Sequence, residues 1–233
     1  MQLVFPVFSG TIISILQLNE LMSRAIQAVF FLLAGMVACL IAKRMFGSLY
    51  SVGLRPLKPV TSNNYLLFLP IVFIELSSLA FGMREGLSAL LVFVFFVFTV
   101  AVGFSEELYF RGLIPNLLMR KNLLVPLLLS SFLFSVGHFF NLLAGAGLVE
   151  TIFQVVFAFL FGIVALEIRL LTGSLVVPIV WHILHNFISL VTKVNDSGSM
   201  LFGVLQGTVL FFYAIYLWKK YLLHRTVEEN HKV

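Results

Sequence analysis

At 233 residues, of which 61% are hydrophobic and only 11% charged, the chain cannot cover a water-facing surface, because soluble domains carry about 25% charged residues. The composition therefore excludes a soluble protein and predicts an all-α, polytopic membrane helix bundle. The net charge of +5 does not indicate nucleic-acid binding, since no long basic run is present to follow phosphates. The single cysteine, Cys39, excludes a disulfide.

Eight apolar segments follow one another with short connections, and their continuous hydrophobicity favours helices over barrel strands. About 20 apolar residues are needed to cross the roughly 30 Å of hydrocarbon. The sequence therefore predicts one membrane-embedded domain over residues 1–233 with seven or eight transmembrane helices. The first segment contains Pro6 and is short, which makes it a candidate for an interfacial helix. The segments are 3–18, 26–42, 64–82, 87–104, 123–141, 149–168, 174–192 and 200–218.

The Lys and Arg residues divide unevenly between the two sets of loops. Arg24, Arg84 and Lys193 fall on one side, and the other twelve of the 15 fall on the opposite side. Because cytoplasmic loops carry the excess of Lys and Arg, the C-terminus is predicted to be cytoplasmic. The small size and short loops are typical of a bacterial plasma-membrane protein. The twelve are Lys43, Arg44, Arg55, Lys58, Arg111, Arg120, Lys121, Arg169, Lys219, Lys220, Arg225 and Lys232.

The first polar cluster is the sequence EELYFR over residues 106–111, at the end of a strongly apolar run. On a helix, Glu107 and Arg111 share one face and can form an ion pair, whereas Glu106 is turned about 100° away from Glu107. Charged groups at membrane depth usually pair, line a cavity and serve function. A carboxylate in a dry pocket can exchange protons near neutral pH. The alternative is a charged helix end at the cytoplasmic surface without chemistry.

A second cluster contains His138, four residues after Phe134 in the segment 123–141. A lone histidine on an apolar helix is more often a hydrogen-bonded interior residue than a catalyst. His138 alone therefore does not indicate chemistry, and its interpretation depends on the other clusters.

The third cluster places His182, His185 and Asn186 within five residues of an apolar segment. His182 and Asn186 project from one helical face, and His185 lies near the same stripe. We expect Pro178, four residues before His182, to kink this helix. These residues predict either a catalytic group or a cluster of interhelical hydrogen bonds.

Together the three clusters supply the parts needed to activate water and to stabilise an oxyanion. The same donor atoms suit zinc, with Glu106, His138 and His182 as the alternative ligands. No HExxH or CxxC motif supports a zinc site, and no GxSxG elbow supports a serine triad.

At these clusters the sequence resembles the CAAX protease and bacteriocin-processing family, also called the Abi family. The family pattern is EExxxR, then FxxxH, then HxxxN or HxxxD, each on a membrane helix, and all three match in order within residues 87–192. The matching residues are Glu106, Glu107 and Arg111, then Phe134 and His138, then His182 and Asn186.

The resemblance implies an intramembrane endopeptidase with its catalytic core over residues 87–192. It implies that Glu106 activates the attacking water, with His138 as its partner in proton handling. It also implies that His182 and Asn186 stabilise the oxyanion. Glu107 and Arg111 would brace the site, and His185, outside the family pattern, would support it. Eukaryotic members trim prenylated CAAX proteins, whereas bacterial relatives are tied to peptide maturation, bacteriocin immunity and surface regulation.

The expected partners are the lipid bilayer and a peptide or membrane-protein substrate. The glutamate-activated-water mechanism needs no metal, so no cofactor is expected, with zinc or another divalent metal as the alternative. Two other functions stay open: a non-catalytic membrane partner, as in bacteriocin immunity or sensor-kinase modulation, and a small proton-coupled transporter. The oligomeric state is not predicted.

The segment limits also set a structural condition. They place Glu106 near the cytoplasmic end of the fourth helix and His138 nearer the outer end of the fifth. The site can assemble only if the fourth helix continues through residue 119 or the fifth helix is tilted.

Overall fold

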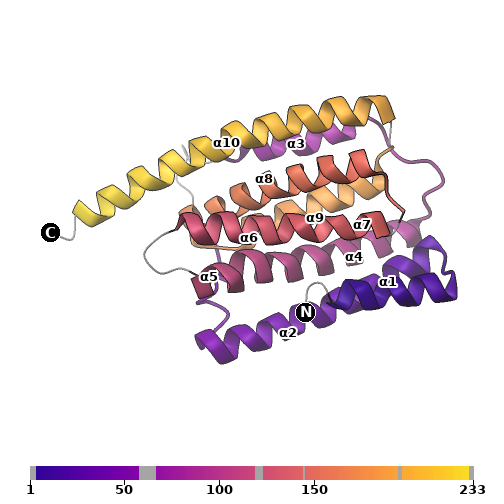
Figure 1. The fold of residues 1–233 in the computed structure, drawn as a ribbon, viewed down its shortest axis with the longest axis horizontal. Coiled ribbons are helices and arrows are strands. Elements are labelled where there is room, and N and C mark those ends of the chain that lie inside the picture. The colour runs from indigo at the N-terminus through magenta and orange to yellow at the C-terminus, as the bar shows by residue number, and fades with distance from the viewer. Residues whose placement is uncertain (1–3, 58–66, 119–122, 144, 194–195, 231–233) are drawn as a thin grey trace.

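The chain folds as a bundle of long helices packed side by side, with α2 along one edge and α10 along the other (Figure 1). A computed structural model describes residues 4–57, 67–118, 123–143, 145–193 and 196–230. It confirms the predicted all-α, polytopic bundle. The helices are α1 (Val4–Leu16), α2 (Glu20–Phe46), α3 (Leu69–Leu79), α4 (Ala89–Glu107), a π-helix (Leu108–Leu113), α5 (Ile114–Leu118), α6 (Leu124–Val136), a 3₁₀ turn (Gly137–Phe139), α7 (Phe140–Leu143), α8 (Leu148–Thr172), α9 (Val176–Val191) and α10 (Asp196–Asn230).

Each predicted apolar segment corresponds to a helix within the described residues. Among the described residues, five helical runs are long and apolar enough to cross a membrane, and α1, α3 and α9 are shorter apolar helices. The 13 residues of α1 extend about 20 Å at 1.5 Å per residue, which is less than the hydrocarbon thickness of about 30 Å. As described, α1 is therefore shorter than the hydrocarbon layer is thick. The five runs are Glu20–Phe46, Ala89–Leu118, Leu124–Leu142, Leu148–Thr172 and Leu201–Tyr221.

Local sequence signals define where the long helices begin and end. The side chains of Asn19 and Ser88 accept hydrogen bonds from backbone N–H groups in the first turns of α2 and α4, as N-cap residues do. Gly47 and Gly173 end α2 and α8 in the left-handed conformation, with φ of 79° and 69°, which favours glycine.

Ion pairs mark one end of the bundle, which we call the Arg84 end. It holds the starts of α2, α4, α8 and α10 and the end of α9 (Figure 1). Arg84 contacts Glu20 at 2.5 Å, and Lys193 contacts Glu85 at 2.6 Å. The contacts join the loop before α4 to the start of α2 and to the residues after α9.

The opposite end, which we call the Arg169 end, holds the ends of α2, α5 and α8 and the starts of α6 and α9. Arg169 Nη2 donates to Asn116 Oδ1 at 2.9 Å, and Arg55 Nε donates to the Gly173 carbonyl at 2.5 Å. These contacts join α8 to α5 and the loop after α2 to Gly173, the residue that ends α8.

The run that begins as α4 continues without a break through the π-helix and α5 to Leu118. Pro115 cannot donate an amide hydrogen bond, which disturbs the helical ladder just before it. Ser130 Oγ of α6 donates a hydrogen bond to the Phe110 carbonyl within the π-helix. The continuation of the fourth helix was one of the two arrangements that the site required, and it places Glu106 in the interior of the bundle.

Two glycines allow the helices around the site to approach closely. A Cβ on Gly103 of α4 would lie 2.8 Å from Ile183 Cγ1 and 3.2 Å from the Ile183 nitrogen in α9. A Cβ on Gly162 of α8 would lie 3.0 Å from the Ser131 Cα of α6. Small residues permit this kind of close packing between membrane helices: Gly103 lets α4 approach α9, and Gly162 lets α8 approach α6.

The expectation of a kink at Pro178 is wrong. Helix α9 begins at Val176, so Pro178 lies in its first turn. The N–H groups there have no partner within the helix, so proline removes no helical hydrogen bond at this position. His182 lies one turn further along a regular helix.

Candidate active site

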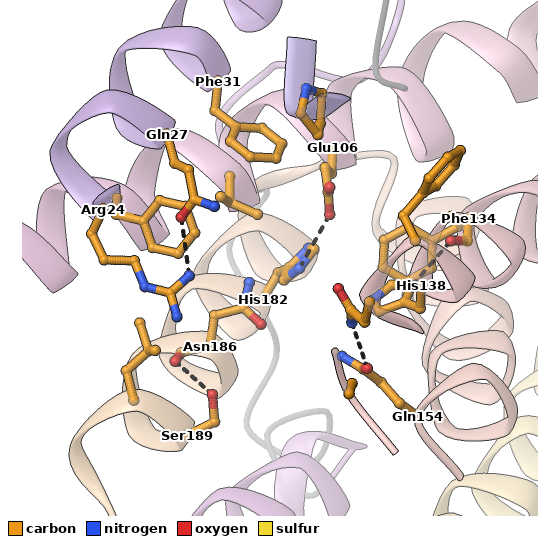
Figure 2. Close-up of a pocket in the computed structure, with 18 of the residues that line it drawn as sticks. Arg24, Gln27, Phe31, Glu106, Phe134, His138, Gln154, His182, Asn186 and Ser189 are labelled. Carbon is orange, nitrogen blue, oxygen red and sulfur yellow. Dashed lines mark hydrogen bonds and ion pairs between the residues drawn. The ribbon is translucent and has the colours of Figure 1, made fainter. Parts of the chain in front are cut away.

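A cavity of about 570 Å³ lies among the helices, and the four predicted catalytic residues Glu106, His138, His182 and Asn186 all line it. Figure 2 shows their side chains around one space, contributed by α4, the 3₁₀ turn after α6, and α9. Three sequence motifs that lie far apart along the chain are thus brought to one site. Its remaining wall comes from the first turns of α2, from α1 and from the start of α8.

The most deeply buried part of the site is a carboxylate that contacts two partners. Glu107 is 0% exposed and Arg111 is 1% exposed, and Glu107 Oε1 lies 3.1 Å from Arg111 Nη1. The same Oε1 lies 2.8 Å from His182 Nδ1. This confirms the predicted ion pair and excludes a solvated helix end. Because a carboxylate accepts and a ring N–H donates, Nδ1 of His182 carries the hydrogen and the ring orientation is fixed.

Glu106 points into the cavity. Its side chain is 19% exposed, and Oε2 lies 3.7 Å from His182 Nε2, as the dashed line in Figure 2 shows. Neighbouring side chains on a helix point about 100° apart. Glu107 therefore faces a buried cation, whereas Glu106 faces a space that can hold water. The opposite nitrogens of His182 contact the two carboxylates.

His138 borders the cavity next to this pair. Its Nδ1 lies 3.2 Å from the Phe134 carbonyl, which can only accept, so the hydrogen of the neutral ring is on Nδ1. Nε2 then carries the lone pair. His138 therefore has a basic nitrogen for a water or substrate group.

Phe134 is the aromatic wall of the site. Its ring centroid lies 4.0 Å from Arg111 Cζ, a cation–π contact that helps to accommodate the buried guanidinium. The same ring lies 5.1 Å from the His138 ring and 5.7 Å from the His182 ring. The phenylalanine of the FxxxH pattern therefore packs against all three motifs.

His185 is held by a residue that the sequence analysis missed. Glu75 of α3 is 6% exposed, and its Oε1 accepts from Trp181 Nε1 at 2.8 Å and from His185 Nδ1 at 3.1 Å. The His185 ring also stacks on Phe157, with 4.9 Å between centroids. A single glutamate within the apolar segment 64–82 was the signal that could have identified Glu75, since charged groups at membrane depth are rarely accidental.

Polar residues from the helix starts complete the cavity wall, and these too were missed. Arg24 Nη1 donates to Gln27 Oε1 at 3.0 Å, and the Arg24 guanidinium carbon lies 5.1 Å from the Phe98 ring centroid. Asn141 Nδ2 donates to Gln154 Oε1 at 2.7 Å. Amides inside apolar segments, and a cation just before the segment 26–42, were the available signal, but sequence alone does not show that they face the same space.

The zinc alternative finds no support in the geometry. Within the described ranges, no group of three or more His, Cys, Asp or Glu side chains lies close enough together to hold a metal ion. Glu106, His138 and His182 share the cavity wall, but they do not form such a group.

Comparisons with known proteins agree with the motifs. Residues 88–188 match the family model described as type II CAAX prenyl endopeptidase Rce1-like. No curated protein and no solved structure shows a significant match to the chain. The matched region contains all three motifs and nearly coincides with the predicted core at 87–192. Over residues 88–188 the chain is therefore similar to the CAAX endopeptidases, which are hydrolases, and its long apolar helices are those of an integral membrane protein.

Proposed function

We propose that this chain is an intramembrane endopeptidase that hydrolyses a peptide bond through a water molecule activated by Glu106. The observation that carries the proposal is the placement of Glu106: its carboxylate borders the cavity next to His182, while Glu107 is fully buried against Arg111. One glutamate can exchange protons with water, and its neighbour maintains the geometry of the site.

In the proposed reaction, Glu106 takes one proton from water as the water oxygen attacks the peptide carbonyl carbon. His138 Nε2 accepts a hydrogen bond from the other proton and so orients the water. The oxygen of the tetrahedral intermediate accepts hydrogen bonds from the Asn186 amide and from Nε2–H of protonated His182. The C–N bond then breaks and Glu106 passes its proton to the departing amine, which leaves a carboxylic acid and an amine.

In this mechanism, His182 must be an imidazolium when negative charge forms on the oxygen of the tetrahedral intermediate. Nδ1–H donates to Glu107, so Nε2 can donate to an oxyanion only when it is also protonated. Glu107 would thus assist His182 as a positioning residue. It contacts neither the water nor the substrate in this scheme.

The size of the cavity limits the form of the substrate. A helix with side chains is 10–12 Å across and rises 5.4 Å per turn, so one turn occupies roughly 400–600 Å³. The cavity of about 570 Å³ therefore holds about one turn of a helix, or a short extended segment. Since a helical carbonyl is already hydrogen-bonded, an extended segment presents the peptide bond better. The remaining N–H groups of Arg24 are suited to bind a carbonyl or carboxylate of that segment.

The test is a comparison of peptides in membrane fractions from cells that express the wild type, Glu106→Gln or His138→Ala at equal levels. Glu106→Gln should abolish specific fragments while insertion and thermal stability are retained. Glu85→Gln is the matched control, because Glu85 is 87% exposed and pairs only with Lys193 among the described residues, so it should leave the fragments unchanged. Fragments that persist in Glu106→Gln would contradict the proposal and favour the non-catalytic partner role.

A further inference from the structure

A small side chamber of about 60 Å³ adjoins the active-site cavity. Its far wall consists of His185 together with Phe157, Ala158 and Phe161. A bound water needs about 10–15 Å³ and two to four polar partners, so the chamber has room for a water beside its aromatic wall. Five residues line both spaces: Phe134, His138, Gln154, His182 and Asn186.

His185 presents one ring nitrogen to this chamber. Its Nδ1 donates to Glu75 Oε1 at 3.1 Å, and Trp181 Nε1 donates to the same oxygen at 2.8 Å. The ring also stacks on Phe157, with 4.9 Å between centroids, so its orientation is fixed from two sides. A neutral histidine that carries its hydrogen on Nδ1 has a lone pair on Nε2. The edge of the ring away from Glu75 therefore offers a hydrogen-bond acceptor at the chamber wall.

Asn186 is the proposed oxyanion donor whose amide lacks such a fixed direction. Glu107 orients His182, but among the described residues no group hydrogen-bonds the Asn186 amide, and Ser189 Oγ bonds only its backbone carbonyl, at 2.8 Å. An asparagine amide carries an accepting oxygen and a donating NH₂ group side by side, and only the NH₂ group can stabilise an oxyanion. A partner that donates to Oδ1 would therefore set the amide in its active direction.

We propose that His185 binds a water molecule in the side chamber, and that this water orients the Asn186 amide toward the oxyanion. The water donates one hydrogen to His185 Nε2 and the other to Asn186 Oδ1. It accepts from Gln154 Nε2, because Gln154 Oε1 already accepts from Asn141, and Figure 2 shows Gln154 and Asn186 on the wall of the same space. Three partners are typical of a buried water. His185 is thus a positioning residue that acts through Asn186. The inference rests on the proposed function for the oxyanion, whereas the bound water does not.

The kinetic test measures cleavage of a peptide that spans a cut identified in the membrane-fraction comparison, with purified full-length variants. His185→Phe keeps a ring that can stack on Phe157 but removes both nitrogens. We expect kcat to fall roughly tenfold and KM to change less than about twofold, because Asn186 acts only as charge forms on the oxygen. His185→Gln should recover most of kcat, since its amide oxygen can accept from the water. Trp181→Phe is the matched control, because it removes the other hydrogen bond to Glu75 outside the chamber, and it should keep kcat.

A double variant separates action through Asn186 from a general disturbance of the site. Asn186→Ala should lower kcat by roughly a hundredfold or more, as the loss of one oxyanion donor does. Adding His185→Phe to Asn186→Ala should then cause no further loss. Losses that multiply, or an unchanged kcat in His185→Phe, would overturn the proposal. A change in KM and in the residues that flank the cut would overturn it as well, since it would indicate that the chamber holds a substrate side chain.

An experimental structure at a resolution that shows ordered waters tests the water itself without a substrate. The expected result is a water bonded to His185 Nε2 and Asn186 Oδ1 in the wild type and lost in His185→Phe. A dry chamber in the wild type would overturn the proposal. Cleavage that persists in Glu106→Gln would instead contradict the peptidase assignment and leave this structural result standing, so the two failures are distinguishable.

Discussion

The ion pair between Glu107 and Arg111 gives the sharpest test of how the site is held. Both side chains are almost completely buried, so replacing Glu107 with Gln leaves the Arg111 charge without its carboxylate. Breaking a buried ion pair costs about 3–5 kcal/mol, and a charged residue at the centre of a membrane helix costs about 2.5–3.5 kcal/mol on insertion scales. We therefore expect Glu107→Gln to lower the free energy of unfolding by about 3 kcal/mol.

A second substitution should relieve the first. Arg111→Met removes the stranded cation, and replacing a whole buried pair by uncharged residues is often close to neutral. The Glu107→Gln/Arg111→Met double variant should therefore regain most of the lost stability, with a coupling free energy of about 2 kcal/mol or more. Glu107→Gln and the double variant both carry the same amide at position 107 and an unchanged His182. The difference between their free energies of unfolding therefore reports the charge of Arg111 and not the contact with His182.

The measurement is a double-mutant cycle in detergent, with unfolding followed as sodium dodecyl sulfate is titrated into purified protein. Cleavage of the fragments identified above is recorded in parallel, and it should stay reduced in the double variant because His182 has lost a charged partner. Losses of stability that simply add in the double variant would refute the claim that Glu107 and Arg111 stabilise each other.

Three further predictions concern the supporting residues, and a fourth concerns metal. Glu75→Leu should lower stability by about 1–3 kcal/mol, because the buried Trp181 N–H loses its acceptor, whereas Glu75→Gln keeps an acceptor and should lose less in the same titration. Gly103→Ala should destabilise by about 1–3 kcal/mol through overpacking against Ile183, which thermal unfolding in detergent would reveal. Arg24→Gln should raise KM for a carboxylate-bearing peptide roughly tenfold but not for its amidated form. Cleavage rates should be unchanged by a zinc chelator, and a loss restored by zinc would contradict the geometry.

The sequence predicted the class of fold correctly, and it singled out residues that the structure places around one cavity, but it misjudged where two of the helices begin and end. Composition alone required a membrane bundle, and the three clusters pointed to Glu106, His138 and His182 before any contact was known. The spacing of four between Glu107 and Arg111 correctly indicated an ion pair, because helical geometry fixes which residues share a face. Such local rules work wherever the partners lie on one helix.

Contacts between helices could not be derived in this way. In the sequence, Glu75 is part of an ordinary apolar segment, although its partners Trp181 and His185 lie more than 100 residues further along the chain. Glu167, buried at 1% exposure with Oε2 unpartnered among the described residues, was overlooked as well. The rule that intramembrane charges require an explanation applied to both residues. The sequence does not show how the helices pack against one another, and without that packing the partners of a buried glutamate cannot be identified.

The position of Pro178 shows a different kind of error, in which a correct rule was applied to the wrong boundary. Proline kinks a helix only where it interrupts an existing hydrogen-bond ladder, and α9 starts just two residues before it. For α4 the predicted boundary was too early rather than too late. Its apolar segment ended near residue 104, whereas the helical run continues to Leu118. Polar residues such as Glu107 and Arg111 ended the hydrophobic signal without ending the helix, since each neutralises the other inside the bundle. That continuation sets Glu106 about 26 Å from the start of α4 at 1.5 Å per residue, within the span rather than at its edge. The polar residues that concealed the length of the helix are thus the same residues that bring Glu106 to the cavity.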